Sequence, residues 1–316
     1  MPDGGKNKKK IKLRHRLEYD VIVAFNILVR IMPPAIIYVF LRVLAFVAFS
    51  ILRIRRDVAL ENIHRAFPGL HEKECRRIAG ASYYHMGMTF VEMLMIPSFA
   101  PRVLEIVNIA DAALLHRMLN ASNGLIIVSA HMGNWELMGA SLAAFGFKLH
   151  PLAKRQSNPL VDDFITRSRA MYGMDVIHND GALKRMVQMV KNKEAVVFVS
   201  DQDSGRRGVF VPFFGVPAST PTGAAQMALK YGTSVMTAFC IRLKPGRYRL
   251  DIREVPVDPN DTVEDVTIRF TRVIEEMVER YPEQYFWMHR RWKTRAPASK
   301  ANMDGGGTPG FGREDA

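Results

Sequence analysis

The chain has 316 residues, of which 48% are hydrophobic and 24% charged, a globular composition that excludes a wholly disordered or fibrous protein. Its net charge is +13, and its length suffices for one large α/β domain or two smaller ones. Cys75 and Cys240 are the two cysteines of the sequence, which excludes a disulfide framework or a zinc ribbon.

The excess positive charge lies mainly at three places: residues 1–20, the arginines within 53–56, and residues 290–295 near the end of the folded part. We find no zinc-finger spacing, RNP-like motif or basic recognition helix, and we predict no nucleic-acid partner. Two of the basic clusters flank an apolar segment. An anionic membrane surface, or an acidic partner beside it, therefore explains the charge better.

Residues 1–20 form a predicted basic tail, and residues 21–56 a predicted pair of hydrophobic helices divided by Pro33-Pro34. The longest apolar stretch, 35–52, is shorter than the roughly 20 residues that a membrane span usually needs, and it contains Arg42. Because both flanks are basic, we predict attachment to a membrane surface by a monotopic or re-entrant helix rather than a single span. The alternative is two buried core helices.

From residue 57 onward the hydrophobic pattern changes from helices to an alternation of strands and helices. Helical spacing covers 57–96, and buried-strand runs include 124–130 and 195–200. Further strands are predicted at 147–153, 175–177, 234–243 and 248–255, with helices at 135–145, 158–171, 183–191, 220–231 and 263–281. This alternation predicts an α/β fold with a mainly parallel central sheet covered by helices. The Gly- and Pro-rich residues 296–316 are predicted to be disordered.

The sharpest local feature is the stretch Ser129-Ala-His131-Met-Gly133-Asn134-Trp-Glu136, where a buried strand leads into a helix. A histidine at the carboxyl end of such a strand faces the crevice where open α/β sheets bind ligands. We expect the amides of Gly133 and Asn134 at the helix N-terminus, positioned to stabilise an oxyanion. We expect Glu136 to turn back and hydrogen-bond the imidazole of His131. The alternative is a helix-edge histidine followed by a first-turn acid.

Ionisable residues also follow two further predicted strands. Arg155 follows the strand 147–153, and Asp201 and Asp203 follow the strand 195–200. The carboxyl ends of parallel strands meet at one edge of a sheet, and a collection of such groups at that edge is typical of an active site. Taken singly, Arg155 could be a loop charge and the two aspartates a turn with helix-capping acids.

Several other chemistries are excluded by missing motifs. The sequence contains no G-x-S-x-G elbow, no P-loop, no G-x-G-x-x-G and no H-E-x-x-H. A metal ion held by His131, Glu136, Asp201 and Asp203 is an alternative, which the single histidine disfavours, and we predict neither a metal nor another cofactor. A general-base enzyme without an obvious covalent nucleophile remains.

The spacing His131-x-x-x-x-Glu136 resembles the H-x4-D/E motif of the lysophospholipid acyltransferase superfamily. A wider set of segments resembles the bacterial lipid A biosynthesis acyltransferases, the lauroyl and myristoyl transferase family, over about residues 20–295. The matching segments are RDVALEN (56–62), AFP (66–68), AHMGNWE (130–136), Arg155 with Asn158-Pro159, DQD (201–203), VFVPFFG (209–215), Thr222-Gly223, and PEQYFWMHRR (282–291) with Lys293-Thr-Arg295.

The resemblance implies that residues 57–295 form an acyltransferase catalytic domain. His131, oriented by Glu136, would deprotonate a hydroxyl that attacks the thioester of an acyl carrier protein or acyl-CoA. Arg155 would bind a phosphate, and Asp203, with Asp201, would order the acceptor or that arginine. The remaining implied contacts are an anionic headgroup on His289, Arg290 and Arg291, and an acyl channel along residues 210–214.

The implied acceptor is a phosphorylated, anionic glycolipid such as a lipid A precursor, and the implied location is the cytoplasmic face of the bacterial inner membrane. A lysophospholipid, an aminolipid or a glycosylated phosphatidylinositol is an alternative acceptor, because acceptor choice depends on pocket shape rather than on the motif. A catalytically silent lipid-binding protein and a hydrolase are the alternatives outside acyl transfer.

Overall fold

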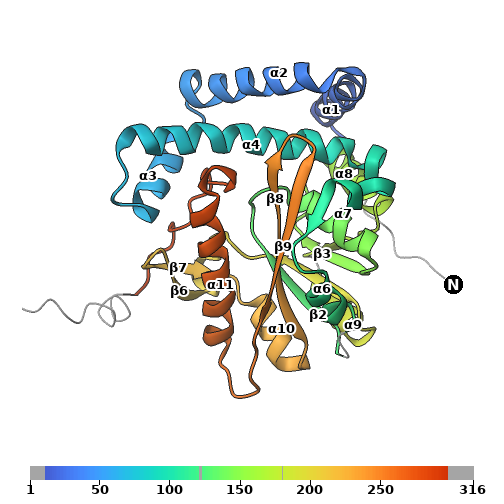
Figure 1. Cartoon of the computed structure of the whole chain (residues 1–316), viewed down its shortest axis with the longest axis vertical. Helices are drawn as coiled ribbons and strands as arrows, with labels where there is room; N and C mark the ends of the chain where they lie inside the picture. The colour runs from blue at the N-terminus through green and yellow to red at the C-terminus, as the bar shows by residue number, and fades with distance from the viewer. Residues whose placement is uncertain (1–10, 121–122, 180, 298–316) are drawn as a thin grey trace, which may run out of the picture.

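The computed structural model describes residues 11–120, 123–179 and 181–297, and these form a central sheet with helices on both faces (Figure 1). The strands are β1 (Val107–Ile109), β2 (Leu125–Ser129), β3 (Leu149–Ala153), β4 (Ile177–His178), β5 (Ala195–Val199), β6 (Val209–Phe213), β7 (Val216–Thr220), β8 (Ser234–Lys244) and β9 (Arg247–Val255). The helices are α1 (Leu13–Ile31), α2 (Pro34–Phe46), η1 (Val47–Ile51), α3 (Arg56–Ala66), α4 (Glu72–Phe99), η2 (Ala100–Arg102), α5 (Val103–Ile106), α6 (Ala112–Leu119), α7 (Trp135–Phe145), α8 (Pro159–Met171), α9 (Ala182–Lys191), η3 (Gly205–Arg207), α10 (Gly223–Tyr231), α11 (Val263–Arg280) and η4 (Pro282–Gln284).

The prediction of a mainly parallel sheet is confirmed. The strand order is β1-β9-β8-β2-β5-β3-β4, and within the described residues of this sheet β8 and β9 are the antiparallel pair. A second, two-stranded sheet of β6 and β7 lies beside α11. Most of the tail predicted to be disordered, from residue 298 onward, lies outside the described residues.

The central strands β2 and β5 are buried along nearly their whole length because helices cover both faces of the sheet. Ile127 packs toward α6 and α7, whereas Val128 packs toward α10 and α11. The chain thus leaves β2 toward α7 on one face and leaves β5 toward α10 on the other. Such a divergence opens a crevice at the carboxyl ends of the two strands, which is where open α/β sheets bind ligands.

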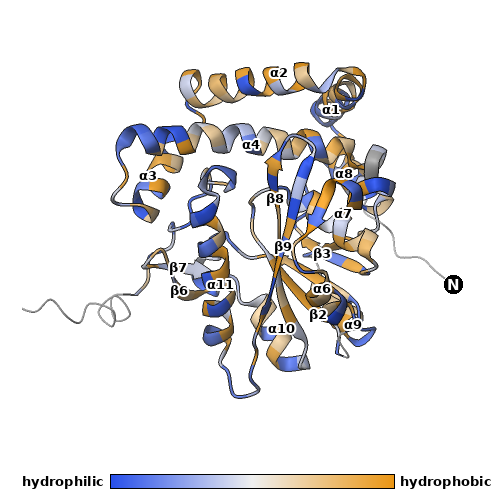
Figure 2. Ribbon diagram, in the orientation of Figure 1, coloured by the Kyte–Doolittle hydropathy of each residue, from blue (hydrophilic) through white to orange (hydrophobic). Residues whose placement is uncertain are grey.

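The apolar N-terminal segment forms two helices, and the predicted break at Pro33-Pro34 is confirmed. Helix α1 begins at Leu13, so the end of the predicted basic tail is helical. Residues Pro34–Ile51 are apolar enough to be a candidate membrane span, with a mean hydropathy of 2.2 and only 11% of the stretch buried. The alternative of buried core helices therefore does not fit this segment, and Figure 2 shows how hydrophobic α2 is.

The long helix α4 lies between α2 and the rest of the fold (Figure 1). Ile37 and Leu41 of α2 pack against Met88 and Val91 of α4. Other residues of α4 face the segment that follows β2, so this one helix contacts both the apolar N-terminal helices and the loop that carries His131.

Candidate active site

His131 and Asp201 lie side by side at the carboxyl edge of the sheet. The register pairs Ser129 of β2 with Val199 of β5, and each of the two residues follows its strand by two positions. Nδ1 of His131 is 2.8 Å from Oδ1 of Asp201, and the backbone N–H of His131 donates to Oδ2 at 3.1 Å. Both oxygens of one carboxylate therefore hold the same histidine.

The contact with Asp201 sets both the tautomer and the basicity of His131. Burial lowers the pKa of His131, but the charge and hydrogen bond of Asp201, with a smaller contribution from Glu136, outweigh it and raise the pKa above its ordinary value of 6.5. The imidazolium in turn holds the pKa of Asp201 below its ordinary value, although burial opposes this. Nδ1 therefore carries the proton that Asp201 accepts, and Nε2 has no hydrogen-bond partner among the described residues.

A cavity of about 510 Å³ opens beside His131, and 27% of that side chain remains exposed. Trp135 and Phe286 flank the imidazole ring, with ring centroids 5.2 and 6.2 Å from it. The polar and charged side chains that line the cavity are His131, Glu136, Lys154, Gln156, Arg169, Asn179, Ser200 and Gln202. The aromatic rings restrict the approach to His131, and the cavity offers a space in which a substrate can reach it.

Glu136 lines the same cavity, but its carboxylate bonds to another partner than the one expected. Its Oε2 accepts from Nε of Arg169 at 3.0 Å and from the Tyr172 hydroxyl at 3.2 Å, and its Oε1 accepts from Arg169 as well. The expected hydrogen bond from Glu136 to His131 is therefore replaced by the one from Asp201. The reason is geometric, because Asp201 follows the neighbouring strand β5, whereas Glu136 points from α7 toward α8.

The amides of Gly133 and Asn134 are already used within the fold, which corrects their expected role as oxyanion donors. Gly133 N–H donates to the Gln284 carbonyl at 2.9 Å, and Asn134 N–H donates to the Cys240 carbonyl at 2.8 Å. Asn134 is instead the N-cap of α7, where its Oδ1 accepts from Leu137 N–H at 2.8 Å. Gly133 has φ +58°, and a Cβ there would lie 2.2 Å from the Cys240 carbonyl oxygen.

Arg155 lies at the predicted edge, two residues beyond β3, and is mostly exposed. Its Nη1 is 3.5 Å from Oδ2 of Asp162, whose Oδ1 accepts from Gln156 N–H. Its neighbours on both sides, Lys154 and Gln156, contribute to the cavity lining. Lys154 is therefore among the residues that line the cavity, whereas Arg155 is not.

Asp203 forms hydrogen bonds with residues near the C-terminal end of the described part of the chain. Oδ2 and Oδ1 of Asp203 accept from the hydroxyl and the N–H of Thr294, and Nε2 of His289 accepts from Asp203 N–H at 3.0 Å. Burial lowers the pKa of His289, which suits a neutral acceptor. The predicted ordering of an acceptor or of Arg155 by Asp203 is thus replaced by contacts within the fold.

Arg290 and Arg291 differ sharply although they are adjacent. Arg291 is 2% exposed, and its guanidinium donates to the Ser219 carbonyl and the Thr220 hydroxyl, each at 2.6 Å. It cannot contact a headgroup in this conformation, whereas Arg290 is exposed. The two residues differ because Arg291 is buried in the fold, where its guanidinium lies over the ring of Phe213.

The aromatic run at 210–214 belongs to β6 and the turn after it, not to the cavity wall. Val211 and Phe213 are buried in the core, and Phe214 adopts φ +52° with its N–H donating to Glu275. The expected acyl channel along this run is therefore not formed by its buried members. In the part of the chain that the structure describes, no group of three or more His, Cys, Asp or Glu residues is arranged to hold a metal ion.

The cavity lining includes polar residues that the sequence-based site did not contain, among them Arg169 and Gln202. Arg169 lies in the last turn of an amphipathic helix, α8, and nothing in its local pattern distinguishes it from an exposed helix charge. Gln202 stands between the two aspartates, and its Nε2 is 3.4 Å from Nδ1 of His131. Its position three residues beyond β5 and directly after Asp201 is the one signal that could have included it.

A histidine whose Nδ1 is held by a buried carboxylate, and whose ring lines a cavity, has the geometry that general-base catalysis requires. The family model of the bacterial lipid A biosynthesis acyltransferases matches residues 6–294. The chain therefore belongs to this family, and it is an acyltransferase.

Similar proteins include the lipid A biosynthesis palmitoleoyltransferase of Escherichia coli, which is 28% identical over 261 residues, covering 80% of this chain and 83% of the relative. The lipid A biosynthesis lauroyltransferase of the same organism is 27% identical over 272 residues, or 84% and 87% of the two chains. The phosphatidylinositol mannoside acyltransferase of Mycobacterium tuberculosis is 27% identical over 144 residues, 44% of each chain.

Proposed function

We propose that the protein transfers a fatty acyl group from an acyl thioester, carried by acyl carrier protein or coenzyme A, to a hydroxyl of a phosphorylated glycolipid such as a lipid A precursor. The observation that carries the proposal is His131, held through Nδ1 by Asp201 and open through Nε2 at a cavity. The names of the E. coli relatives, which are lipid A biosynthesis transferases, support the choice of acceptor.

In the proposed reaction, Nε2 of His131 takes the proton of the acceptor hydroxyl while its oxygen attacks the thioester carbonyl carbon. The carbon–oxygen bond forms, the carbonyl becomes an oxyanion, and the carbon–sulfur bond then breaks. The leaving thiolate takes the proton from the imidazolium, which restores the base. Asp201 stabilises the imidazolium between these two proton transfers.

The polar and charged side chains that line the cavity have two different roles. Arg169 is paired with the buried Glu136, and this ion pair forms part of the cavity wall. Glu136 also contributes its negative charge to the basicity of His131, which is the part we propose for it in place of a direct hydrogen bond. Lys154 at the rim and Gln202 beside the imidazole supply the donors for an acceptor phosphate and for the oxyanion.

The test is an assay of the purified protein with acyl thioester donors and defined acceptors, read by mass spectrometry. We expect the mass of a Kdo-lipid A precursor to rise by that of one acyl group. Transfer to a lysophospholipid or a glycosylated phosphatidylinositol instead would contradict the proposed acceptor. Release of free fatty acid without an acylated acceptor would indicate a hydrolase, and binding of lipid without turnover would indicate a silent binding protein.

We further propose that α2 attaches the enzyme to the cytoplasmic face of the bacterial inner membrane. The face of α2 that does not contact α4 presents a row of large apolar side chains to solvent. Its members are Ile36, Val39, Phe40, Val43, Leu44 and Phe46, each between 43 and 61% exposed. Arg53 and Arg55 follow η1 and are exposed, where they can contact anionic lipid headgroups.

The substitution Val43→Asp is expected to weaken binding to anionic phospholipid vesicles at least about tenfold, because a carboxylate within an apolar helix costs roughly 2.5–3.5 kcal/mol in the hydrocarbon region. Vesicle co-sedimentation measures the effect. Leu183→Asp is the matched control, since Leu183 is 63% exposed on α9, away from the N-terminal helices. Equal losses for the two variants, or no loss for Val43→Asp, would contradict attachment through α2.

A further inference from the structure

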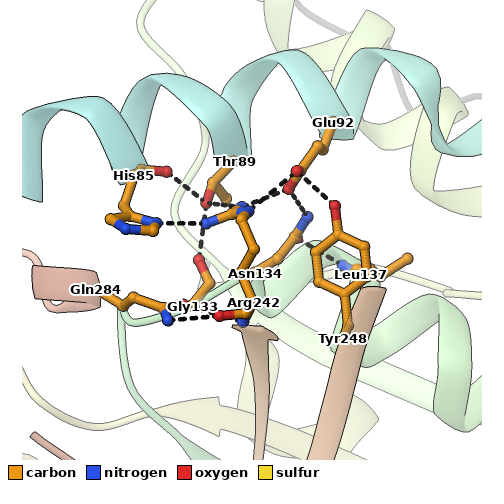
Figure 3. Close-up of polar contacts among 9 residues, drawn as sticks. All are labelled: His85, Thr89, Glu92, Gly133, Asn134, Leu137, Arg242, Tyr248 and Gln284. Atoms are coloured by element: carbon orange, nitrogen blue, oxygen red, sulfur yellow. Dashed lines mark hydrogen bonds and ion pairs between the residues drawn. The ribbon is translucent and has the colours of Figure 1, made fainter. Parts of the chain in front are cut away.

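The loop of residues 131–134 also contacts a buried polar network whose members are not part of the cavity lining (Figure 3). It joins four segments that are far apart in the sequence: α4, the loop itself, the pair β8 and β9, and η4. Its members are His85, Thr89, Glu92, Gly133, Asn134, Arg242, Tyr248 and Gln284. None of these described residues lines the cavity, so the network does not bind substrate directly.

The centre of the network is an ion pair between Glu92 and Arg242, both 6% exposed. Nε of Arg242 donates to Oε1 of Glu92 at 3.1 Å, and the Tyr248 hydroxyl donates to the same oxygen at 2.5 Å. His85 accepts from Nη1 of Arg242 at 2.8 Å. Burial, together with the charge of Arg242, lowers the pKa of His85 to about 4, so this histidine is a neutral acceptor at physiological pH.

Two hydrogen bonds connect this centre to the loop that carries His131. The Thr89 hydroxyl donates to the Gly133 carbonyl at 2.7 Å, and Nδ2 of Asn134 donates to Oε2 of Glu92 at 2.7 Å. Figure 3 shows both bonds reaching the loop from the same helix, α4. The opposite side of the loop is pressed against β8, where the Cys240 carbonyl leaves no space for a side chain at position 133.

A buried ion pair is a weak source of net stability, because the cost of taking two charges out of water offsets their attraction, and apolar residues of similar size often serve as well. What an ion pair with directed hydrogen bonds does supply is a fixed geometry. Here the two hydrogen bonds from α4 hold Gly133 and Asn134, which lie two and three positions after His131. A general base must be held within a fraction of an ångström of its working position, because misplacement by about 1 Å can cost about 100-fold in rate.

We propose that Thr89, Glu92 and Arg242 are positioning residues, which act through Gly133 and Asn134 to hold the imidazole of His131 between Asp201 and the substrate. The proposal rests on the proposed function of His131 as the general base. In this proposal α4 contributes to catalysis, although none of its described residues lines the cavity.

The first test is the substitution Thr89→Val, which keeps the size of the side chain and removes the hydroxyl. We expect kcat to fall about tenfold with KM unchanged, because the hydroxyl acts on the base and not on substrate binding. Thr89→Ser keeps the hydroxyl and should restore kcat to within twofold of the wild type. Thr267→Val is the matched control, since Thr267 is also buried in a helix but, within the described residues, its hydroxyl bonds to Val263 of that helix alone.

A second variant separates positioning from folding. The double substitution Glu92→Leu with Arg242→Met removes both charges, so that neither is left buried and unpaired. We expect a folded protein whose kcat is about 100-fold lower. This variant also decides the question if Thr89→Val does not fold.

Wild-type kcat in a folded Thr89→Val or in the folded double variant would overturn the inference, as would an equal loss of kcat in Thr89→Ser or Thr267→Val. The variant His131→Ala, measured in the same assay, distinguishes the two proposals. Activity in His131→Ala would refute the proposed function itself. An inactive His131→Ala beside a fully active Thr89→Val would refute only the positioning role.

Discussion

Replacing His131 with alanine is expected to lower kcat/KM for acyl transfer by about 10³-fold, the middle of the range that a positioned general base contributes. The imidazole is the one group in the described cavity that is held by a buried carboxylate and still has an open ring nitrogen. Without it the acceptor hydroxyl must attack while it keeps its proton. Steady-state kinetics with a labelled acyl thioester measures the loss.

The control for this experiment is His71→Ala, because His71 is exposed at the start of α4 and lies outside the cavity lining. Its kinetics should match those of the wild type. Circular dichroism should show that both variants are folded. If His131→Ala keeps more than a tenth of the wild-type activity while folded, the general base is another group and the proposed mechanism fails.

Replacing Asp201 with asparagine is expected to have the second-largest effect and a distinctive pH dependence. The carboxylate raises the pKa of His131, whereas burial alone lowers it. Since only the neutral imidazole accepts a proton, activity falls as the pH drops through this pKa, and the acid limb of kcat/KM in the wild type lies above pH 6.5. In Asp201→Asn the pKa falls, so the limb moves to lower pH.

The same substitution should reduce the maximal kcat/KM about 100-fold, because the imidazolium loses its counterion. An asparagine also offers one oxygen where two donors of His131, the ring N–H and the backbone N–H, now meet two carboxylate oxygens. One of these donors would then face the amide NH₂ group. A pH series of kcat/KM from pH 5 to 9 measures both effects in one experiment.

Two variants make the Asp201 experiment specific. Glu136→Gln should move the acid limb in the same direction but less, because Glu136 contributes only the smallest of the charges that act on His131. Asp203→Asn should leave the limb in place, because Asp203 bonds to Thr294 and not to the imidazole. A larger shift in Glu136→Gln than in Asp201→Asn would show that Glu136 is the main partner of His131 during catalysis.

Much of the fold could be predicted because its signals are local. The isoleucine and valine runs of β2 and β5 predict buried strands, and a central parallel sheet needs such runs because both of its faces are covered. Asn158 followed by Pro159 predicts the start of α8, and the Asn158 side chain does cap that helix by accepting from Leu160 N–H. Short strands such as β1 and the helix α6 escaped prediction because their apolar patterns are brief.

The candidate site could be predicted only in part. The rule that carboxyl ends of parallel strands meet at one edge correctly brings His131, Arg155 and Asp201 to the same edge. Which of these side chains contact one another depends on the order of the strands in the sheet. The periodicity of hydrophobic residues does not encode that order. The sheet places β5 between β2 and β3, so Asp201 lies next to His131 while Arg155 follows the strand beyond.

The sequence alone determined the class of fold, the strand that delivers His131, and the family resemblance, because each depends on residues that are close together in the chain. The tertiary structure decided which side chains pair with Glu136 and with His131. Glu136 meets Arg169 across 33 positions, and His131 meets Asp201 across 70. The physical reason is that a buried charge must be neutralised by whatever group the packing brings within reach, and that group is set by strand order and helix docking rather than by the neighbouring sequence.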